Sequence, residues 1–150
     1  MKVNSTRLLW VVQQFRRYYD RQFTDLLARS GLTMREMDVI LFLTNNPGHD
    51  TARDVTELRG LSKSQVSAAV DLLAGRGLLR RLPDRTDRRV VHLALTDQGT
   101  ALSRAGKEIQ SRCLETLFSG LSQPEADCFQ TLLEKVLTHA AAQLKEGGRV

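Results

Sequence analysis

The chain has 150 residues, of which 41% are hydrophobic and 26% charged, so it is long enough to bury a core and has an ordinary globular composition. It contains no run of about 18 apolar residues and no signal-peptide pattern, which predicts a cytoplasmic protein that does not interact with membranes. Its formal net charge of +5 favours a polyanionic partner.

Apolar residues recur at steps of three and four along most of the chain, which predicts a mainly helical fold. The expected helices cover residues 5–29, 34–45, 52–59, 63–74, 97–118 and 123–145. Several of these helices begin directly after a serine or threonine. An acidic or amide residue stands three positions after that hydroxyl residue, which is the pattern of a capping box. These pairs are Thr33 with Glu36, Thr51 with Asp54 as a weaker variant, Ser62 with Gln65, and Ser122 with Glu125.

A β-hairpin is expected between the fourth and fifth helices. Two short β-like runs, residues 78–82 and 90–95, flank a turn that carries Arg85, Arg88 and Arg89 beside two aspartates. Guanidinium groups pair with phosphates and fit narrow grooves of duplex DNA. The hairpin is therefore a candidate DNA-binding element.

The positive charge is concentrated around this hairpin. From residue 59 to residue 89 there are eight basic and three acidic residues, so this region alone carries +5, which equals the net charge of the whole chain. Within the turn, either Asp84 or Asp87 is expected to brace a neighbouring guanidinium through a bidentate pair.

The helices expected at 52–59 and 63–74 have the spacing of a helix-turn-helix, with Gly60 in the turn. In that motif the second helix enters the major groove with its N-terminus first. The solvent-facing candidates for base reading at that end are Lys63, Ser64, Gln65, Ser67 and Ala68. Gln65 is also the acceptor of the expected capping box, so both of its roles stay open.

With these features the sequence resembles the MarR family of bacterial transcriptional regulators. The resemblance rests on the wing motif at residues 84–89, which read DRTDRR, and on residues 95–99, which read LTDQG. The start of the fourth helix at residues 61–67 and its exit at residues 77–81 match as well. The order of the helices extends the likeness over nearly the whole chain.

The resemblance implies a mainly α fold with a small β-hairpin wing, in a single domain over residues 1–150. A winged helix-turn-helix lobe is expected over residues 33–95. Long N- and C-terminal dimerisation helices are expected within residues 1–30 and 97–146.

The function implied is that of a sequence-specific DNA-binding regulator, a ligand-responsive repressor that acts as a homodimer on a pseudo-palindromic operator. The two recognition helices would lie in successive major grooves and the wings in the flanking minor grooves. By position, Arg88 is the wing-tip arginine and Asp87 its brace, while Arg85 and Arg89 contact the DNA backbone.

The family is commonly released from DNA by a small, often phenolic, ligand or by thiol oxidation. Aromatic and basic side chains of the first helix are candidates to line a cleft for an aromatic acid, although the same spacing fits core or interface residues. These are Trp10, Arg16, Tyr18 and Tyr19. The effector stays unassigned, and neither a cofactor nor a metal is expected, because the histidines are scattered.

The oxidation-sensitive branch of the family carries its cysteine in the first helix, and this chain has none there. Cys113 and Cys128 lie late in the chain, which counts against peroxide sensing. Both are interpreted as buried small apolar residues.

Two other classes of function are considered. An enzyme is not expected, because the sequence has no nucleophile elbow, phosphate-binding glycine loop or metal-ligand motif. The remaining alternative is a winged-helix scaffold that binds proteins without binding DNA, and such a scaffold has no need for so concentrated a positive charge.

Overall fold

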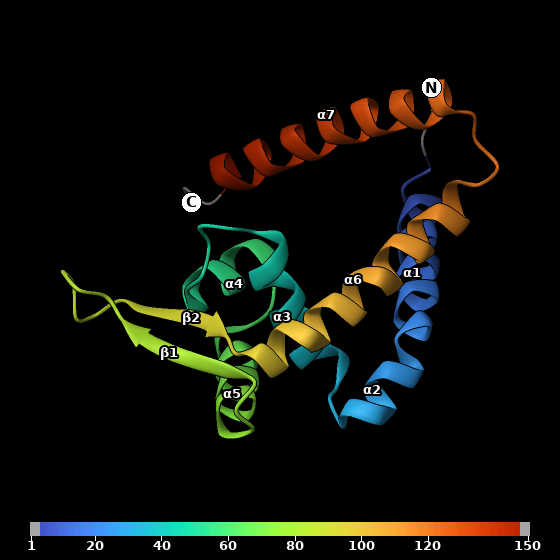
Figure 1. The fold of residues 1–150 in the computed structure, drawn as a ribbon. Helices are drawn as coiled ribbons and strands as arrows, with labels where there is room; N and C mark the ends of the chain where they lie inside the picture. The colour runs from blue at the N-terminus through green and yellow to red at the C-terminus, as the bar shows by residue number, and fades with distance from the viewer. Residues whose placement is uncertain (1–3, 148–150) are drawn as a thin grey trace. The chain divides into compact units, whose positions relative to one another are not determined.

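The computed structural model describes the backbone of residues 4–147 and the side chains of residues 4–143. The described part of the chain is mainly helical with one two-stranded antiparallel hairpin, which confirms the predicted fold class (Figure 1). The elements are α1 (Ser5–Gln22), α2 (Thr24–Ser30), α3 (Met34–Asn45), α4 (Ala52–Arg59), α5 (Lys63–Gly75), β1 (Leu79–Pro83), β2 (Val91–Leu95), α6 (Asp97–Phe118) and α7 (Gln123–Gly147). They form two compact units, which divide within α6 after Cys113.

The single first helix expected over residues 5–29 is wrong, because α1 ends before Phe23 and α2 begins after it (Figure 1). The backbone N–H of Phe23 donates to the carbonyl of Asp20 at 3.2 Å, which tightens the last turn of α1. The kink lets the Phe23 ring enter the core, where it is fully buried and lies 5.0 Å from the ring of Tyr19. Apolar periodicity cannot detect such a break, since the pattern resumes in phase beyond it.

The core of the first unit lies between α3, α5 and the inner face of the hairpin. On α3, Met37, Ile40 and Leu41 are all at most 3% exposed. Leu79 of β1 and Leu93 of β2 complete the same cluster. One face of the hairpin is thereby anchored in the core, and its turn is left free to extend outward.

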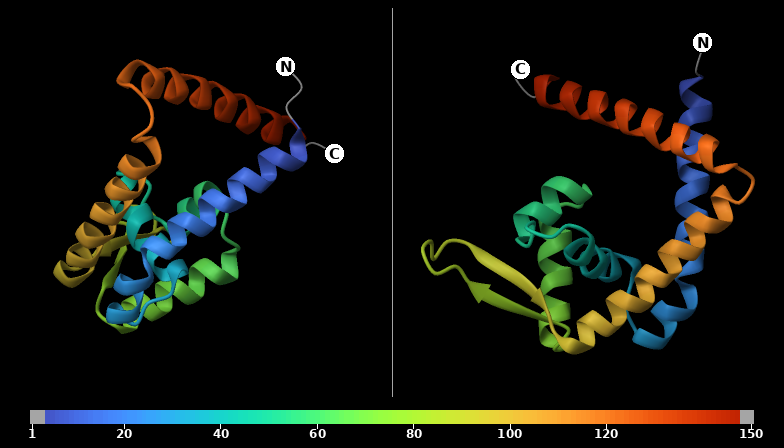
Figure 2. Two further views of the ribbon diagram at one scale, coloured as in Figure 1. Left: turned by 90° about the vertical axis from the view of Figure 1, so that its right-hand side faces the viewer. Right: turned by 45° about the horizontal axis from the view of Figure 1, so that its top comes forward.

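The register of the hairpin pairs Leu79 with Leu95 at its base and Pro83 with Val91 near its turn. The end of the hairpin that carries the turn projects away from α4 and α5 (Figure 2). Asp84 continues the pairing beyond the strands, because its N–H donates to the carbonyl of Val90 at 3.0 Å.

The junction between β2 and α6 explains the LTDQG motif. The Thr96 hydroxyl donates to the carbonyl of Gly77 at 2.7 Å and accepts the N–H of Gly99 at 3.2 Å. The Thr96 N–H donates to the carbonyl of Leu78 at 3.1 Å, and that carbonyl also lies against Gly99. A Cβ atom at Gly99 would come 2.0 Å from the Leu78 oxygen, so glycine is required there by close approach.

In the second unit, α7 begins at a capping box in which Glu125 accepts the N–H and hydroxyl of Ser122 at 2.8 and 2.7 Å. The rings of Phe118 and Phe129 lie 5.4 Å apart. Ala126 is the one described side chain of α7 that is not exposed. Apolar side chains that are more than two-fifths exposed follow one another along the helix: Phe129, Leu132, Leu133, Val136 and Leu137.

The two cysteines differ in their surroundings. Cys113 on α6 is buried, as predicted, and burial raises the pKa of its thiol. Cys128 on α7 is exposed, so the prediction of a buried residue there is wrong. The prediction treated the two cysteines alike, whereas of the described side chains of α7 only Ala126 is not exposed.

No helix in the described range is long and apolar enough to cross a membrane.

Candidate nucleic-acid interface

The helix-turn-helix is built from α4 and α5, whose starts were both predicted from their caps. Thr51 and Ser62 each close a capping box with the residue three positions later. Between the helices, Gly60 adopts a left-handed conformation with φ 72°, which only glycine enters without strain. The turn therefore needs just three residues before α5 begins.

The first turns of α5 present the predicted base-reading side chains. Lys63, Ser64, Ser67 and Ala68 are exposed, as expected for residues that face a groove. Gln65 is half-buried, and its side-chain oxygen accepts the N–H of Ser62 at 3.0 Å, so that oxygen is held by the cap.

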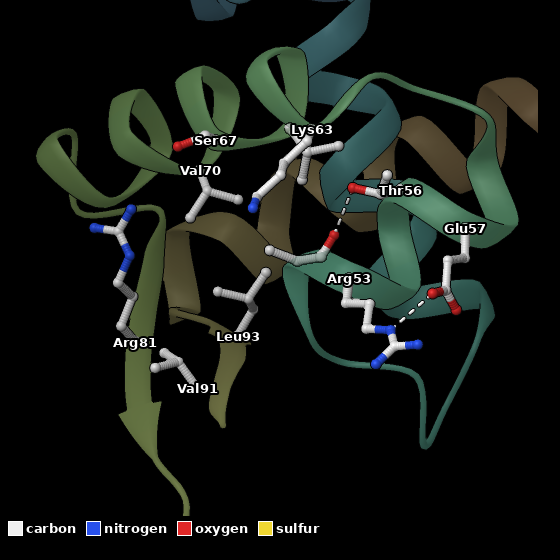
Figure 3. Close-up of a pocket in the computed structure, with 11 residues that line it drawn as sticks. Arg53, Thr56, Glu57, Lys63, Ser67, Val70, Arg81, Val91 and Leu93 are labelled. Carbon is white, nitrogen blue, oxygen red and sulfur yellow. Dashed lines mark hydrogen bonds and ion pairs between the residues drawn. The ribbon is translucent and has the colours of Figure 1, made fainter. Parts of the chain in front are cut away.

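A cavity of about 500 Å³ opens between α4, α5 and the hairpin (Figure 3). Its walls are mainly apolar, with Val66 and Val70 from α5 and Leu93 from β2. Lys63, Ser67, Arg53 and Arg81 supply polar atoms at its edge, and Arg81 also forms an ion pair with Asp71 of α5. This ion pair connects the first strand of the hairpin to the second helix of the motif.

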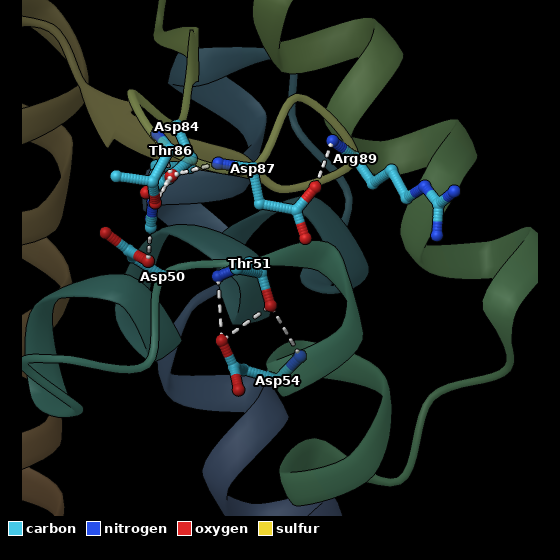
Figure 4. A network of polar contacts seen from close by, with 8 residues as sticks. Asp50, Thr51, Asp54, Asp84, Thr86, Asp87 and Arg89 are labelled. Atoms are coloured by element: carbon cyan, nitrogen blue, oxygen red, sulfur yellow. Dashed lines mark hydrogen bonds and ion pairs between the residues drawn. The ribbon is translucent and has the colours of Figure 1, made fainter.

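The wing turn is organised by its two aspartates (Figure 4). Asp84 Oδ1 accepts the N–H groups of Thr86 and Asp87 at 2.7 and 2.8 Å and the Thr86 hydroxyl at 2.7 Å. Asp87 Oδ1 accepts the backbone N–H of Arg89 at 2.9 Å. The hydrogen bond from the Asp87 N–H is the largest of several that hold the pKa of Asp84 far below its usual range.

These contacts correct one expectation. The acids were expected to brace a guanidinium by a bidentate pair, and among the described residues neither forms an ion pair with an arginine of the turn. A carboxylate within two or three residues of a turn reaches the backbone N–H groups more easily than a distant guanidinium. Arg85, Arg88 and Arg89 are all exposed on the turn so formed.

His92 of β2 was not anticipated as part of the site. Its Nδ1 lies 2.7 Å from Asp50 Oδ1, and its Nε2 lies 3.1 Å from Asp84 Oδ2. These two carboxylates raise the pKa of His92, the hydrogen bond with Asp50 contributing most. No sequence signal connects His92 with Asp50, which is 42 residues earlier.

A second unpredicted feature is the Asp38 carboxylate of α3, which is 4% exposed. Its Oδ2 lies 3.2 Å from a guanidinium nitrogen of Arg16 on α1, and its Oδ1 lies 2.6 Å from one of Arg59 on α4. Three helices thus meet at one buried carboxylate.

The four side chains proposed for an effector cleft have different surroundings. Arg16 is bound to Asp38, and the Tyr19 hydroxyl accepts a hydrogen bond from Gln110 at 2.7 Å. Tyr18 lines a separate surface cavity on α1, and Trp10 is 57% exposed. In the part of the chain described, no three His, Cys, Asp or Glu residues are placed to hold a metal ion.

A helix-turn-helix followed by an anchored β-hairpin with a basic turn defines a winged helix-turn-helix protein. Residues 30–90 match the family model described as MarR family. The chain is 32% identical over 88 residues to the "Transcriptional repressor MprA" of Escherichia coli strain K12, which covers 59% of this chain and 50% of that protein. It is 28% identical over 122 residues to the "HTH-type transcriptional regulator PecS" of Dickeya dadantii, which covers 80% of this chain and 74% of that one.

Among solved structures, a MarR transcriptional regulator from Methanosarcina mazei Go1 superposes with a TM-score of 0.79 at 19% identity, covering 92% of this chain and 99% of that one. This likeness concerns the fold. In sequence, the chain is similar to the MarR family over residues 30–90. The chain spans half the length of the MprA repressor.

Proposed function

We propose that this protein is a sequence-specific DNA-binding transcriptional regulator, a ligand-responsive repressor that acts as a homodimer on a pseudo-palindromic operator. The observation that supports this most is the pairing of an exposed α5 N-terminus with a wing whose three turn arginines are exposed. The relatives MprA and PecS are both named as transcriptional regulators and not as enzymes. The DNA-binding lobe would comprise residues 33–95.

In this proposal the residues have distinct roles. Lys63, Ser64, Ser67 and Ala68 face the major groove, and Gln65 is available there only through its amide nitrogen. Arg88 enters the minor groove, while Arg85 and Arg89 contact phosphates. Asp87 acts by holding the backbone of the turn, since its carboxylate already accepts the Arg89 N–H.

The homodimer would form through residues 1–30 and 97–146. Large apolar side chains of α1 are at least 44% exposed, and water-exposed apolar surface of this extent is characteristic of an interface. They are Leu8, Leu9, Trp10, Val11, Val12 and Phe15. A small aromatic or phenolic effector completes the proposal, with no residue assigned to it.

DNA binding is tested by fluorescence anisotropy with mixed genomic fragments over a range of salt concentrations. We expect binding that weakens steeply with salt, because each phosphate neutralised contributes about −0.9 to the slope of log K against log salt. Absence of binding at low salt would exclude a DNA reader and favour the protein-binding scaffold.

Replacing Arg88 with alanine is expected to weaken DNA binding by about 1–3 kcal/mol, the range for one specific arginine contact. The fold should be unaffected, because the side chain is exposed. Arg35→Ala on α3 is the matched control, since it removes the same charge from an exposed position outside the wing. Equal affinities of the two variants in the anisotropy assay would rule out a groove contact for Arg88.

A further inference from the structure

His92 connects two segments that are far apart in the sequence. Asp50 belongs to the segment between α3 and α4, and Asp84 begins the wing turn. The imidazole ring lies between their carboxylates, with one ring nitrogen within hydrogen-bond distance of each. A neutral imidazole has only one N–H, so only the imidazolium can donate to both carboxylates at once.

The contacts continue on both sides of the ring. Asp84 uses Oδ2 for His92 and Oδ1 for the N–H groups of Thr86 and Asp87, so the same carboxylate holds the ring and the turn. On the other side, the Leu93 N–H donates to the carbonyl of Asp50 at 2.7 Å. Thr51, the N-cap of α4, forms an isolated β-bridge with His92. An unbroken series of hydrogen bonds therefore runs from the start of the helix-turn-helix to the arginine-bearing turn.

We propose that His92 is a positioning residue for DNA recognition, whose imidazolium fixes the wing turn relative to the N-terminus of α4. The inference rests on the proposed function, because the arginines that it positions are the proposed DNA contacts. The geometry gives His92 this role: Leu79 and Leu93 anchor the hairpin in the core and Arg81 pairs with Asp71 of α5, and the ring adds an attachment next to the turn through Asp84.

The charges that face the ring come from two sides. They are Asp50, from the segment before α4, and Asp84, from the turn. On β1 the residue paired with His92 is Leu82, which is uncharged, and on α4 the Asp54 carboxylate is directed at Thr51 and His49. The two carboxylates, of Asp50 and Asp84, both raise the pKa of His92.

DNA affinity should depend on the protonation of His92. A raised pKa in the folded state means that folding favours the imidazolium form, and the contribution of this form is lost as pH rises through that pKa. Above it, one of the two hydrogen bonds loses its proton and the turn is held less firmly. DNA affinity should therefore fall as pH rises, in a step that follows the titration of His92.

The experiment compares wild-type protein with three variants, using labelled mixed genomic DNA fragments at constant salt between pH 6 and 9. Wild type should lose affinity by about threefold to tenfold as pH rises. His92→Gln should bind more weakly at low pH and show no such step. His49→Gln is the matched control: His49 lies in the same segment and pairs with Asp54 at 3.6 Å without contacting the wing, so it should behave as wild type.

Asp50→Ala tests the attachment itself, because alanine has no oxygen to accept the ring N–H. It leaves His92 able to titrate but removes one of its two attachments, so the step should flatten if the ring positions the wing. An undiminished step in Asp50→Ala, or a step that survives in His92→Gln, would overturn the proposal.

A second readout does not require DNA. In the free protein, the NMR signals of the Thr86 and Asp87 amides should shift with the midpoint of the His92 ring titration. Amides that do not respond overturn the proposal even if DNA is bound. If the amides respond but no fragment binds at low salt, the attachment exists and the proposed function is what fails.

Discussion

Replacing Gly99 with alanine is expected to destabilise the protein by about 3 kcal/mol, the upper end of the cost of overpacking a tight site. The added Cβ would lie 2.0 Å from the Leu78 oxygen and 3.1 Å from its carbonyl carbon. Both atoms belong to the backbone, so a side-chain rotation cannot relieve the clash. Urea unfolding followed by circular dichroism measures the effect.

The backbone at this point has little freedom to move. The Leu78 carbonyl accepts the N–H of Thr96 at 3.1 Å, and the Leu78 N–H donates to the carbonyl of Leu73 at 2.9 Å. Moving Leu78 away from Gly99 therefore disturbs both the end of α5 and the start of α6. Leu78 also leads directly into β1, so the same shift would reach the wing.

Gly75→Ala provides the control for this substitution. Gly75 is helical as well, and a Cβ there meets nothing within 4 Å. Alanine should be neutral or stabilising at that position, because it costs less conformational entropy in a helix than glycine. If Gly99→Ala and Gly75→Ala unfolded at the same urea concentration, the backbone near Leu78 would accommodate a Cβ atom, and close approach would not require glycine at position 99.

The elements that could be predicted from the sequence are those specified by local chemistry. Caps are decided by residues three positions apart, and the bounds predicted for residues 34–45, 52–59 and 97–118 agree with α3, α4 and α6. The hairpin was similarly predictable, because its strands and turn lie within a few residues of each other. The wing motif at residues 84–89 is local too, and the resemblance to the MarR family rests largely on it.

What could not be predicted depends on contacts between distant residues. The break at Phe23 places a ring that is fully buried in the core, and the partners of His92 come from separate segments. The roles of Asp84 and Asp87 were misassigned for a related reason. Composition shows that acids accompany arginines, whereas geometry decides whether a carboxylate meets a guanidinium or a backbone N–H.

Replacing Asp38 with asparagine should cost about 2 kcal/mol of unfolding free energy, within the range for hydrogen bonds to charged groups. Asparagine keeps the shape but has a single acceptor oxygen, and its amide would direct N–H groups at one of the two guanidiniums. The loss is smaller than for a fully buried ion pair, because the Arg16 and Arg59 side chains are 46% and 33% exposed and water can partly solvate them.

Glu57→Gln is the matched control, since Glu57 pairs with Arg53 of the same helix at 2.7 Å and both side chains are more than half exposed. Removing that charge should change the free energy of unfolding by less than about 0.5 kcal/mol. Urea denaturation of both variants tests whether the effect of Asp38 depends on its burial or only on its ion pairs. If the two substitutions lowered the free energy of unfolding equally, burial would add nothing to the effect of the ion pairs. Because Asp38 holds α1 and α4 together through α3, its loss should also increase amide hydrogen exchange in α1 and α4 while leaving β1 and β2 protected.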